Sequence, residues 1–359
     1  MGRDEGGNRM GKITALLIEQ SAKDESAQVL LRSKLRAVSR RMRFSDAMRE
    51  RMELVCNELM TNQNKYAKGN GFVQIWEVEQ PRPALDLFAM DYGPGIPNLA
   101  DAIQDGYTTS GTMGKGLGAI KRLSSESDFY SLPEEQAADC PWHGMAVWAR
   151  FHDDIMPVAT PHQFGCYLRA YQDSTYNGDL IRLHLGKNKT RWLHMDGLGH
   201  GREAFEAVDG LDNFLDAETT IPNMMSSLSQ RLQGGRGAVG IVCEIDAAAN
   251  AAIVTGVGDM VAYNVCNGDK RAITFSPGVL GHAHRTPESA SLPFPPQALF
   301  ITASDGLRRN MTLRTFPDLW RLHPQLIAMV LGQVMGRNND DKSVFVARKM
   351  RNERNSHEK

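Results

Sequence analysis

The sequence has few cysteines, and they are not spaced as structural metal ligands are. The five residues, Cys56, Cys140, Cys166, Cys243 and Cys266, lie at wide, irregular intervals and form no CxxC pair. Structural zinc sites are built from such close pairs, so we do not expect a zinc site. An odd number of cysteines in a chain of 359 residues is typical of reduced, mostly buried thiols.

Long apolar runs and a targeting segment are also absent. No stretch reaches the ~20 apolar residues that span a bilayer, and the run near Gly237 is interrupted by Glu244 and Asp246. Residues 1–12 are rich in glycine and charge, without the apolar core of a signal peptide. Gly6 stands where an N-myristoylation signal has Ser or Thr. We therefore expect a soluble, cytoplasmic protein.

No excess of charge of one sign is present. The chain has 41 Lys and Arg against 42 Asp and Glu, a net charge of -1. This balance gives no support for a broad nucleic-acid or membrane surface, so we expect neither as a partner. The hydrophobic fraction of 42% and the charged fraction of 23% exclude a wholly disordered or fibrous chain. At ~150 residues per domain, the length predicts two domains.

The first half begins with two long helical patterns. Apolar residues recur at helical spacing over residues 22–43 and 45–67, and Ser45 is a candidate N-cap for the second helix. Alternating or apolar runs predict strands at 72–79, 84–91 and 145–151, with a helix at about 118–125. Residues 152–161 carry two prolines and an Asp-Asp pair, which predicts a linker.

The second half is dominated by short strand-like runs. We expect helices at 203–215, 221–232 and 325–335, and strands at 166–170, 180–185, 191–195, 238–245, 252–256, 260–265, 298–303 and 343–347. Many strands with a few helices favour an α+β sandwich over a parallel sheet of βαβ units.

The first group of candidate site residues lies in the first half. Glu58 and Asn62 are four apart, which places them on one helix face, where a carboxylate can accept a proton and a carboxamide oxygen can bind Mg²⁺. Asp91-Tyr-Gly-Pro-Gly95 offers an acceptor for an adenine amino group, beside glycines that allow close approach. Gly114-Lys-Gly-Leu-Gly118 precedes a helix, where backbone amides can face phosphate.

In order and spacing, these three boxes read ExxxN, DxGxG and GxGxG, and they resemble the GHKL ATPase superfamily. The likeness covers about residues 12–151. It is greatest to the serine kinases of bacterial sigma-factor partner switching, and residues 106–123 look like their stressosome switch-kinase branch. The resemblance implies a Bergerat α/β sandwich that binds ATP and Mg²⁺, with Glu58 as general base and Asn62 on the metal. Its nucleotide-binding residues would be Asn62, Asp91, Gly93, Gly95, Gly114, Lys115, Gly116, Leu117 and Gly118. Gln63 and Asn64 depart from the small or apolar residues usual there.

The second group consists of aspartates in glycine-rich turns, several of which follow apolar strands. They lie in Asn177-Gly-Asp179, Asp196-Gly-Leu-Gly-His-Gly201, Gly256-Val-Gly-Asp259, Ser304-Asp-Gly306 and Asn339-Asp-Asp341. Carboxylates without cysteine suit Mg²⁺ or Mn²⁺. Two such ions about 3.5–4 Å apart can hold a bridging hydroxide and neutralise a phosphate. The spacings of His194, His200, His282 and His284 match no metal motif, although His200 lies within the loop after Asp196.

Taken in order, these turns resemble the metal-dependent protein phosphatases of the PPM family, in their SpoIIE-type bacterial branch. The likeness covers about residues 163–348 and implies an α-β-β-α sandwich with two Mn²⁺ or Mg²⁺ ions. The implied ligands are Asp179, the bridging Asp196, the Gly197 carbonyl, Asp305 and Asp340, with Asp341 and Ser343 completing the last motif and Asp259 secondary. Leu180 and Lys342 depart from the usual pattern, and we expect no arginine to clamp the substrate phosphate.

Together, the two resemblances imply a bifunctional signalling enzyme. A GHKL domain (12–151), a linker (152–162), a phosphatase domain (163–348) and a basic tail (349–359) would phosphorylate and dephosphorylate Ser or Thr of STAS-domain proteins. Those partners would be anti-sigma-factor antagonists or stressosome subunits, and the likeness also admits a homodimer. Two alternatives stay open. The ATP domain could be a nucleotide-gated binding module, leaving only the phosphatase catalytic, or an internal regulator of the phosphatase.

Overall fold

The computed structural model describes residues 13–23, 25–103, 116–138, 140–153, 160–186, 188–211, 214–215 and 219–350. Within these ranges the chain is a mixture of helices and antiparallel sheets, which confirms the α+β class. The candidate residues Gly114 and Lys115, most of the expected linker and residues 351–359 of the expected tail lie outside the described residues.

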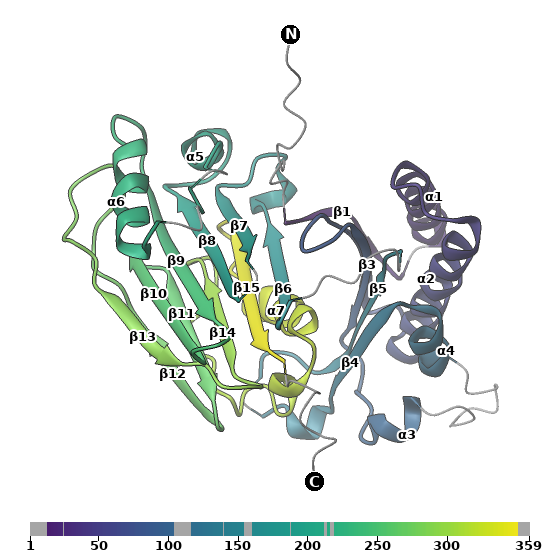
Figure 1. Ribbon diagram of the computed structural model, residues 1–359. Coiled ribbons are helices and arrows are strands. Elements are labelled where there is room, and N and C mark those ends of the chain that lie inside the picture. Colours follow the sequence, from purple (N-terminus) through teal and green to yellow (C-terminus); the bar gives the residue numbers. More distant parts are fainter. Residues whose placement is uncertain are drawn as a thin grey trace.

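The N-terminal part is one antiparallel sheet of five strands in the order β1-β2-β3-β5-β4. Its strands are β1 (Thr14–Ser21), β2 (Gly71–Val78), β3 (Ala84–Asp91), β4 (Glu126–Leu132) and β5 (Gly144–Phe151). The accompanying helices are α1 (Glu25–Arg41), α2 (Asp46–Ala67), α3 (Leu99–Ile103) and α4 (Gly116–Leu123). In Figure 1, α1, α2 and α4 lie on one side of this sheet, and a single apolar cluster joins them to it.

Helix α2 shows how local sequence sets the position of the first candidate site. Its N-cap is Ser45, whose side chain accepts a hydrogen bond from the Met48 amide, as the sequence predicts. It ends where Lys68 adopts a left-handed conformation, followed by Gly69. Met52, Val55 and Leu59 are buried against the sheet, so the opposite edge of the helix is free to present polar side chains.

The C-terminal part consists of two antiparallel five-stranded sheets that pack face to face. One has the order β13-β10-β9-β8-β7 and the other β12-β11-β14-β15-β6. The strands are β6 (His162–Arg169), β7 (Asp179–Leu185), β8 (Lys189–Gly197), β9 (Ala238–Asp246), β10 (Ala251–Val257), β11 (Val261–Cys266), β12 (Asp269–Ile273), β13 (Ser289–Pro293), β14 (Leu299–Ala303) and β15 (Lys342–Lys349). Trp192, Phe300 and Phe345 make aromatic contacts between the sheets.

In the described part of the chain, three helices cover the outer faces of this sandwich. Helices α5 (Arg202–Val208) and α6 (Ile221–Arg231) pack on the sheet that contains β8 and β9, over an apolar cluster that also buries Leu180. Helix α7 (Pro324–Val334) packs on β6 and β15 of the other sheet. Short 3₁₀ turns lie at Glu134–Gln136, Tyr171–Asp173 and Leu319–Arg321.

Helix α7 also contacts the N-terminal sheet, so the two parts of the chain share a core. It lies between the strands of the two parts in Figure 1 and contacts β4 and β5. All residues from Pro324 to Gly332 are buried. One apolar cluster joins Trp76 and Trp148 of the N-terminal sheet to Tyr167 and to this helix. At the start of α7, His323 stacks on Trp148 with ring centroids 4.4 Å apart.

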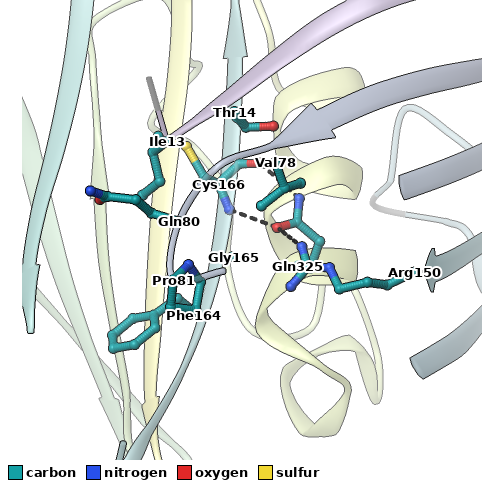
Figure 2. Close-up of a pocket in the computed structure, with 10 residues that line it drawn as sticks. All are labelled: Ile13, Thr14, Val78, Gln80, Pro81, Arg150, Phe164, Gly165, Cys166 and Gln325. Carbon is teal, nitrogen blue, oxygen red and sulfur yellow. Dashed lines mark hydrogen bonds between the residues drawn. The ribbon is translucent and has the colours of Figure 1, made fainter. Parts of the chain in front are cut away.

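Gln325 fastens α7 to both parts. Its side-chain amide accepts a hydrogen bond from the Cys166 amide at 3.1 Å and donates one to the Cys166 carbonyl at 2.7 Å, so it occupies an unpaired edge of β6. Arg150 of β5 donates to the same Gln325 oxygen at 3.2 Å and forms a buried ion pair with Asp86. Figure 2 shows this junction beside a small pocket, where the buried Gln80 Oε1 has no hydrogen-bond partner among the described residues.

Gly165 allows this close contact, which leads to a stability prediction. A Cβ atom at Gly165 would lie 2.0 Å from the Pro324 carbonyl oxygen, so Gly165→Ala must displace α7. We expect a loss of about 1–3 kcal/mol in the free energy of unfolding, measured by urea denaturation. Gly235→Ala is the control, because nothing lies closer than 3.4 Å to a Cβ there, and it should change stability by less than about 0.5 kcal/mol. Equal stability of the two variants would contradict the close contact.

Most of the predicted elements are present, some elements differ in extent, and others were not predicted. The helix expected at 203–215 ends at Val208, where Asp209 is extended and Gly210 has a φ of +75°. Strands β1, β4, β12 and β13 and helix α3 were not predicted. Strand β6 begins at His162, within the expected linker, and β15 extends to Lys349. Every helix in the described ranges is too short or too polar to cross a lipid bilayer.

Candidate functional site

The N-terminal candidate residues Glu58, Asn62 and Gly116 lie together. A Cβ atom at Gly116 would lie 3.3 Å from Glu58 Oε2 and 3.5 Å from both amide atoms of Asn62. Gly116 is the first residue of α4, so the amide-bearing end of this helix faces the polar edge of α2. Leu117 is half-buried and Gly118 buried as α4 continues. A larger residue than glycine at 116 would fill the space beside the carboxylate and the carboxamide.

Asp91 ends β3 and is held in one orientation by backbone donors. Its Oδ1 accepts hydrogen bonds from the Gly93 amide at 2.9 Å and the Met145 amide at 3.1 Å. Burial raises the pKa of Asp91, and these two bonds oppose the rise. Because both bonds end on Oδ1, Oδ2 is the oxygen left for a ligand.

Glycines bring the loop after β3 close to its neighbours. Gly95 has a φ of +75°, and a Cβ atom there would lie 2.8 Å from the Leu132 carbonyl oxygen. A Cβ atom at Gly93 would lie 3.4 Å from the Ala67 side chain. Since Ala67 ends α2, the same helix connects the Asp91 loop with Glu58 and Asn62.

Three residues near Asp91 were not predicted from the sequence to belong to this site. Trp142 Nε1 donates to the Asp91 carbonyl at 2.8 Å, and His143 Nδ1 lies 2.7 Å from the Gly93 carbonyl oxygen. Gly144 has a φ of +132°, and a Cβ atom there would lie 2.8 Å from Asp91 Oδ1. The glycine just before a predicted strand was the available signal for this close approach.

The departure at Gln63 has a packing explanation. The Gln63 side chain is buried against Gly71, where a Cβ atom would lie only 1.7 Å from Gln63 Oε1. The glycine therefore makes room for the glutamine, and the α2 backbone that carries Asn62 is undisturbed.

In the C-terminal part, five candidate aspartates lie at the ends of different strands. Asp179 begins β7 and Asp196 lies near the end of β8, directly opposite it in the ladder. Asp259 follows β10, Asp305 follows β14 and Asp340 precedes β15. Burial raises the pKa of Asp196, and the negative charges of Asp179, Asp305, Asp340 and Asp259 raise it further. The topology therefore gathers these distant aspartates at one end of the sandwich.

Asp179 has one satisfied oxygen and one unsatisfied oxygen. Its Oδ2 accepts hydrogen bonds from Ser343 Oγ at 2.6 Å and Ser304 Oγ at 2.8 Å. Its Oδ1 is buried and has no partner among the described residues. Burial raises the pKa of Asp179, the two serine bonds oppose this, and Asp341 and Asp340 add to the rise. A buried carboxylate oxygen without a donor is costly unless a cation satisfies it.

Both carboxylate oxygens of Asp341 accept hydrogen bonds from the backbone, so this residue has a structural role. Its Oδ1 accepts from the Tyr171 amide at 2.7 Å and its Oδ2 from the Gly178 amide at 2.8 Å. It thereby fixes the backbone just before Asp179.

Glycines also shape the loop after Asp196. A Cβ atom at Gly197 would lie 2.3 Å from the Ala204 carbonyl oxygen, and Gly199 and Gly201 have φ values of +85° and +79°. The glycine-rich loop is thus required to lead from β8 into α5.

The aspartate carboxylates suit a hard cation, although they do not converge into a complete coordination site. Within the described ranges, no three Asp, Glu, His or Cys side chains are grouped tightly enough to hold a metal ion. Neighbouring carboxylates nonetheless raise the pKa of Asp196 and that of Asp305, because like charges repel one another. A divalent cation would relieve this repulsion and satisfy Asp179 Oδ1, so the residues fit such an ion.

Positive charge also lies near this cluster, which bears on the expectation that no arginine clamps the substrate phosphate but does not test it. Arg337 and Arg309 each act to lower the pKa of Asp305, and Arg337 and His200 act to lower that of Asp340. The Arg337 amide donates to the Gly306 carbonyl at 2.7 Å, next to Asp305. The sequence reading missed Arg337 because it lies 32 residues beyond Asp305 and becomes its neighbour only where the chain leaves α7.

Comparison with known proteins gives one curated relative and several similar structures. Over 101 residues at the N-terminal end, the chain is 35% identical to the serine/threonine-protein kinase RsbT of Bacillus subtilis (strain 168), covering 28% of this chain and 75% of RsbT. No family model matches the chain.

Among solved structures, a crystal structure of RsbX in complex with magnesium is 17% identical with a TM-score of 0.47, covering 52% of this chain and 94% of that one. The phosphatase domain of SpoIIE from Bacillus subtilis, with a fragment of its regulatory domain, is 17% identical with a TM-score of 0.42, covering 91% and 95%. Because both TM-scores are low, we base the functional proposal on the residues themselves.

Proposed function

Through its N-terminal part, the chain belongs to the family of the serine/threonine-protein kinase RsbT, and on this premise we propose that it is a bifunctional enzyme. Residues 12–151 would phosphorylate Ser or Thr of STAS-domain proteins with ATP and Mg²⁺, in a GHKL fold. Residues 163–348 would remove such phosphates with two Mn²⁺ or Mg²⁺ ions, in a PPM fold. The substrates would be anti-sigma-factor antagonists or stressosome proteins of a partner-switching pathway.

The kinase assignment is supported by the space around Gly116. Glu58 and Asn62 border this space together, as a base and a metal ligand beside a nucleotide must. Asp91 Oδ2 would accept the adenine amino group, since Oδ1 is already bonded to the backbone. Gly93 and Gly95 would admit the base, and the segment Gly114–Gly118 would face the phosphates with its amides.

The observation that carries the phosphatase assignment is Asp179 Oδ1, which is buried without a partner among the described residues, in a group of aspartates whose charges act on Asp196. Asp179, Asp196, Asp305, Asp340 and the Gly197 carbonyl would hold two ions. Bound there, the ions would supply an activated hydroxide and neutralise phosphate charge. The chain's own contribution is to gather these oxygens at rigid strand ends. His200 and Arg337, whose charges act to lower the pKa of Asp340, would contact the phosphoprotein.

Dephosphorylation of a STAS protein phosphorylated on serine tests the phosphatase half directly. We expect phosphate release that requires Mn²⁺ or Mg²⁺ and stops when EDTA is added. Release that is unaffected by EDTA would contradict a metal-dependent phosphatase.

A second candidate function is favoured by the position of α7. This helix packs against the N-terminal sheet at one end. At its other end the amide of Arg308, three residues after Asp305, donates to the Met335 carbonyl at 2.8 Å. The ATP domain could therefore regulate the phosphatase within one chain. A phosphatase rate that changes when ATP is added, without any kinase substrate, would favour this function; an unchanged rate would favour independent activities.

A further inference from the structure

Three side chains of β8 point to the same side of the strand, and two of them connect Asp179 to the core. Trp192, His194 and Asp196 alternate along β8, so they share one face. Trp192 and His194 are fully buried between the two sheets. The proposed ligand Asp196 lies at the end of this row, and a chain of hydrogen bonds leads from the other two to Asp179.

The chain of hydrogen bonds crosses from one sheet to the other. Trp192 Nε1 donates to Thr302 Oγ1 at 3.2 Å, and Thr302 Oγ1 lies 2.9 Å from His194 Nδ1. His194 Nε2 lies 2.7 Å from Ser343 Oγ, which donates to Asp179 Oδ2 at 2.6 Å. Thr302 and Ser343, on β14 and β15, are completely buried, and Asp179 is 3% exposed.

With Asp179 ionised, as a carboxylate that binds a cation must be, the chemistry of the groups allows only one order of protons along these hydrogen bonds. The indole only donates, and an ionised carboxylate only accepts. Since the single Ser343 proton goes to Asp179, Ser343 must accept from His194 Nε2–H. A neutral imidazole then accepts at Nδ1, from the Thr302 hydroxyl, which in turn accepts from Trp192. Thr302 and Ser343 then each accept one of these hydrogen bonds and donate one, and the tautomer of His194 is set.

We propose that this hydrogen-bond chain positions Asp179 for a divalent cation, with His194 as its central positioning residue and Asp179 Oδ1 as the ligand atom. Ser343 and Ser304 both bind Oδ2 and so fix the carboxylate, which leaves Oδ1, without a partner among the described residues, as the oxygen for the ligand. The far end is anchored because Trp192 packs on Phe300 and Phe345. The inference rests on the proposed phosphatase function and adds how its first ligand is oriented.

The test is the affinity of the full chain for Mn²⁺, measured by titration calorimetry without nucleotide. Thr302→Val keeps the shape of the side chain but removes the hydroxyl between Trp192 and His194. We expect Mn²⁺ to bind about tenfold more weakly, the lower end of the 10–100-fold range for groups that orient metal ligands. Thr302→Ser, which restores the hydroxyl, should recover most of the affinity.

Thr255→Val is the matched control. Thr255 is also a completely buried strand threonine, and its hydroxyl has a partner in Ser289 Oγ at 2.6 Å. Among the described residues, it takes no part in the hydrogen bonds that lead from Trp192 to Asp179. It should leave Mn²⁺ affinity unchanged. Ser343→Ala, which removes the donor to Asp179, should show a loss toward 100-fold. Thermal melting of each variant without metal verifies that it is folded.

The outcomes separate this inference from the proposed function. If the unaltered chain binds no Mn²⁺, both fail. If it binds Mn²⁺ and Thr302→Val binds equally well, the phosphatase proposal stands, but the proposal that the hydrogen bonds through His194 position Asp179 is wrong. An equal loss of affinity in Thr302→Val and Thr255→Val would also overturn it, because the effect would then be one of general packing.

Discussion

Replacing Glu58 with Gln should lower phosphoryl transfer by roughly 10²–10⁴-fold while ATP binding persists. Glutamine keeps the size of the side chain beside Gly116 but cannot accept the proton of an attacking hydroxyl. The measurement is the initial rate of transfer to a STAS protein at saturating ATP, with nucleotide binding followed separately by calorimetry.

Glu50→Gln serves as its control. Glu50 is an exposed carboxylate on the same helix, eight residues before Glu58, so its loss removes the same charge without touching the site. Transfer at the full rate in Glu58→Gln would show that Glu58 is not the base. Loss of ATP binding in the same variant would instead place Glu58 in nucleotide binding.

Asp196→Asn should have an effect of comparable size on the phosphatase. Asp196 lies opposite Asp179, and the charges of four other aspartates act on it, so it is the best placed to bridge two ions. Metal ions contribute several kcal/mol to phosphate-transfer transition states, which corresponds to a loss on the order of 10³-fold in rate. The measurement is phosphate release in saturating Mn²⁺.

The control for this variant is Asp246→Asn. Asp246 also ends a strand of the same sheet, but the pairing places it at the opposite end from Asp196. Its Oδ1 accepts from two amides of its own turn, and asparagine can keep both bonds. Full phosphatase activity in Asp196→Asn would remove this residue from the proposed metal site.

The same Asp196→Asn change should stabilise the metal-free chain. Burial and neighbouring carboxylates raise the folded-state pKa of Asp196 above the unfolded value of about 3.9. The folded state therefore binds more protons than the unfolded state above about pH 4, so stability falls as pH rises toward the raised pKa. Asparagine removes this penalty. In EDTA, the melting temperature of the unaltered chain should fall more between pH 5 and pH 8 than that of the variant; parallel curves would contradict the mutual repulsion.

Elements with a strong local signal could be predicted from the sequence, and those that depend on packing could not. Ser45 and the apolar spacing of α2 carry their own information, so that helix was predicted to within a residue. Strand β12, with exposed charged residues, has little apolar pattern to detect. Helix α7 had an unused signal, since a helix apolar on all sides must be covered on all sides.

The candidate sites follow the same rule. Glycine spacing pointed to the loops around Asp91 and Asp196, where close approach or positive φ requires glycine. His194 was tested only against metal-binding spacings, and its real partners, Thr302 and Ser343, come from strands more than 100 residues away. Long-range pairing of this kind is set by the sheet topology and leaves no local pattern in the sequence.

A single experiment tests whether this chain both adds phosphate to a partner and removes it from the same partner. The Asp305→Ala variant would be incubated with γ-labelled ATP, Mg²⁺ and candidate STAS-domain proteins, and the labelled product would then be given to the unaltered chain in Mn²⁺. We expect label on a STAS protein in the first step and its removal in the second. No label on any STAS candidate, despite demonstrable ATP binding, would contradict the kinase claim and leave a nucleotide-gated binding module joined to a phosphatase.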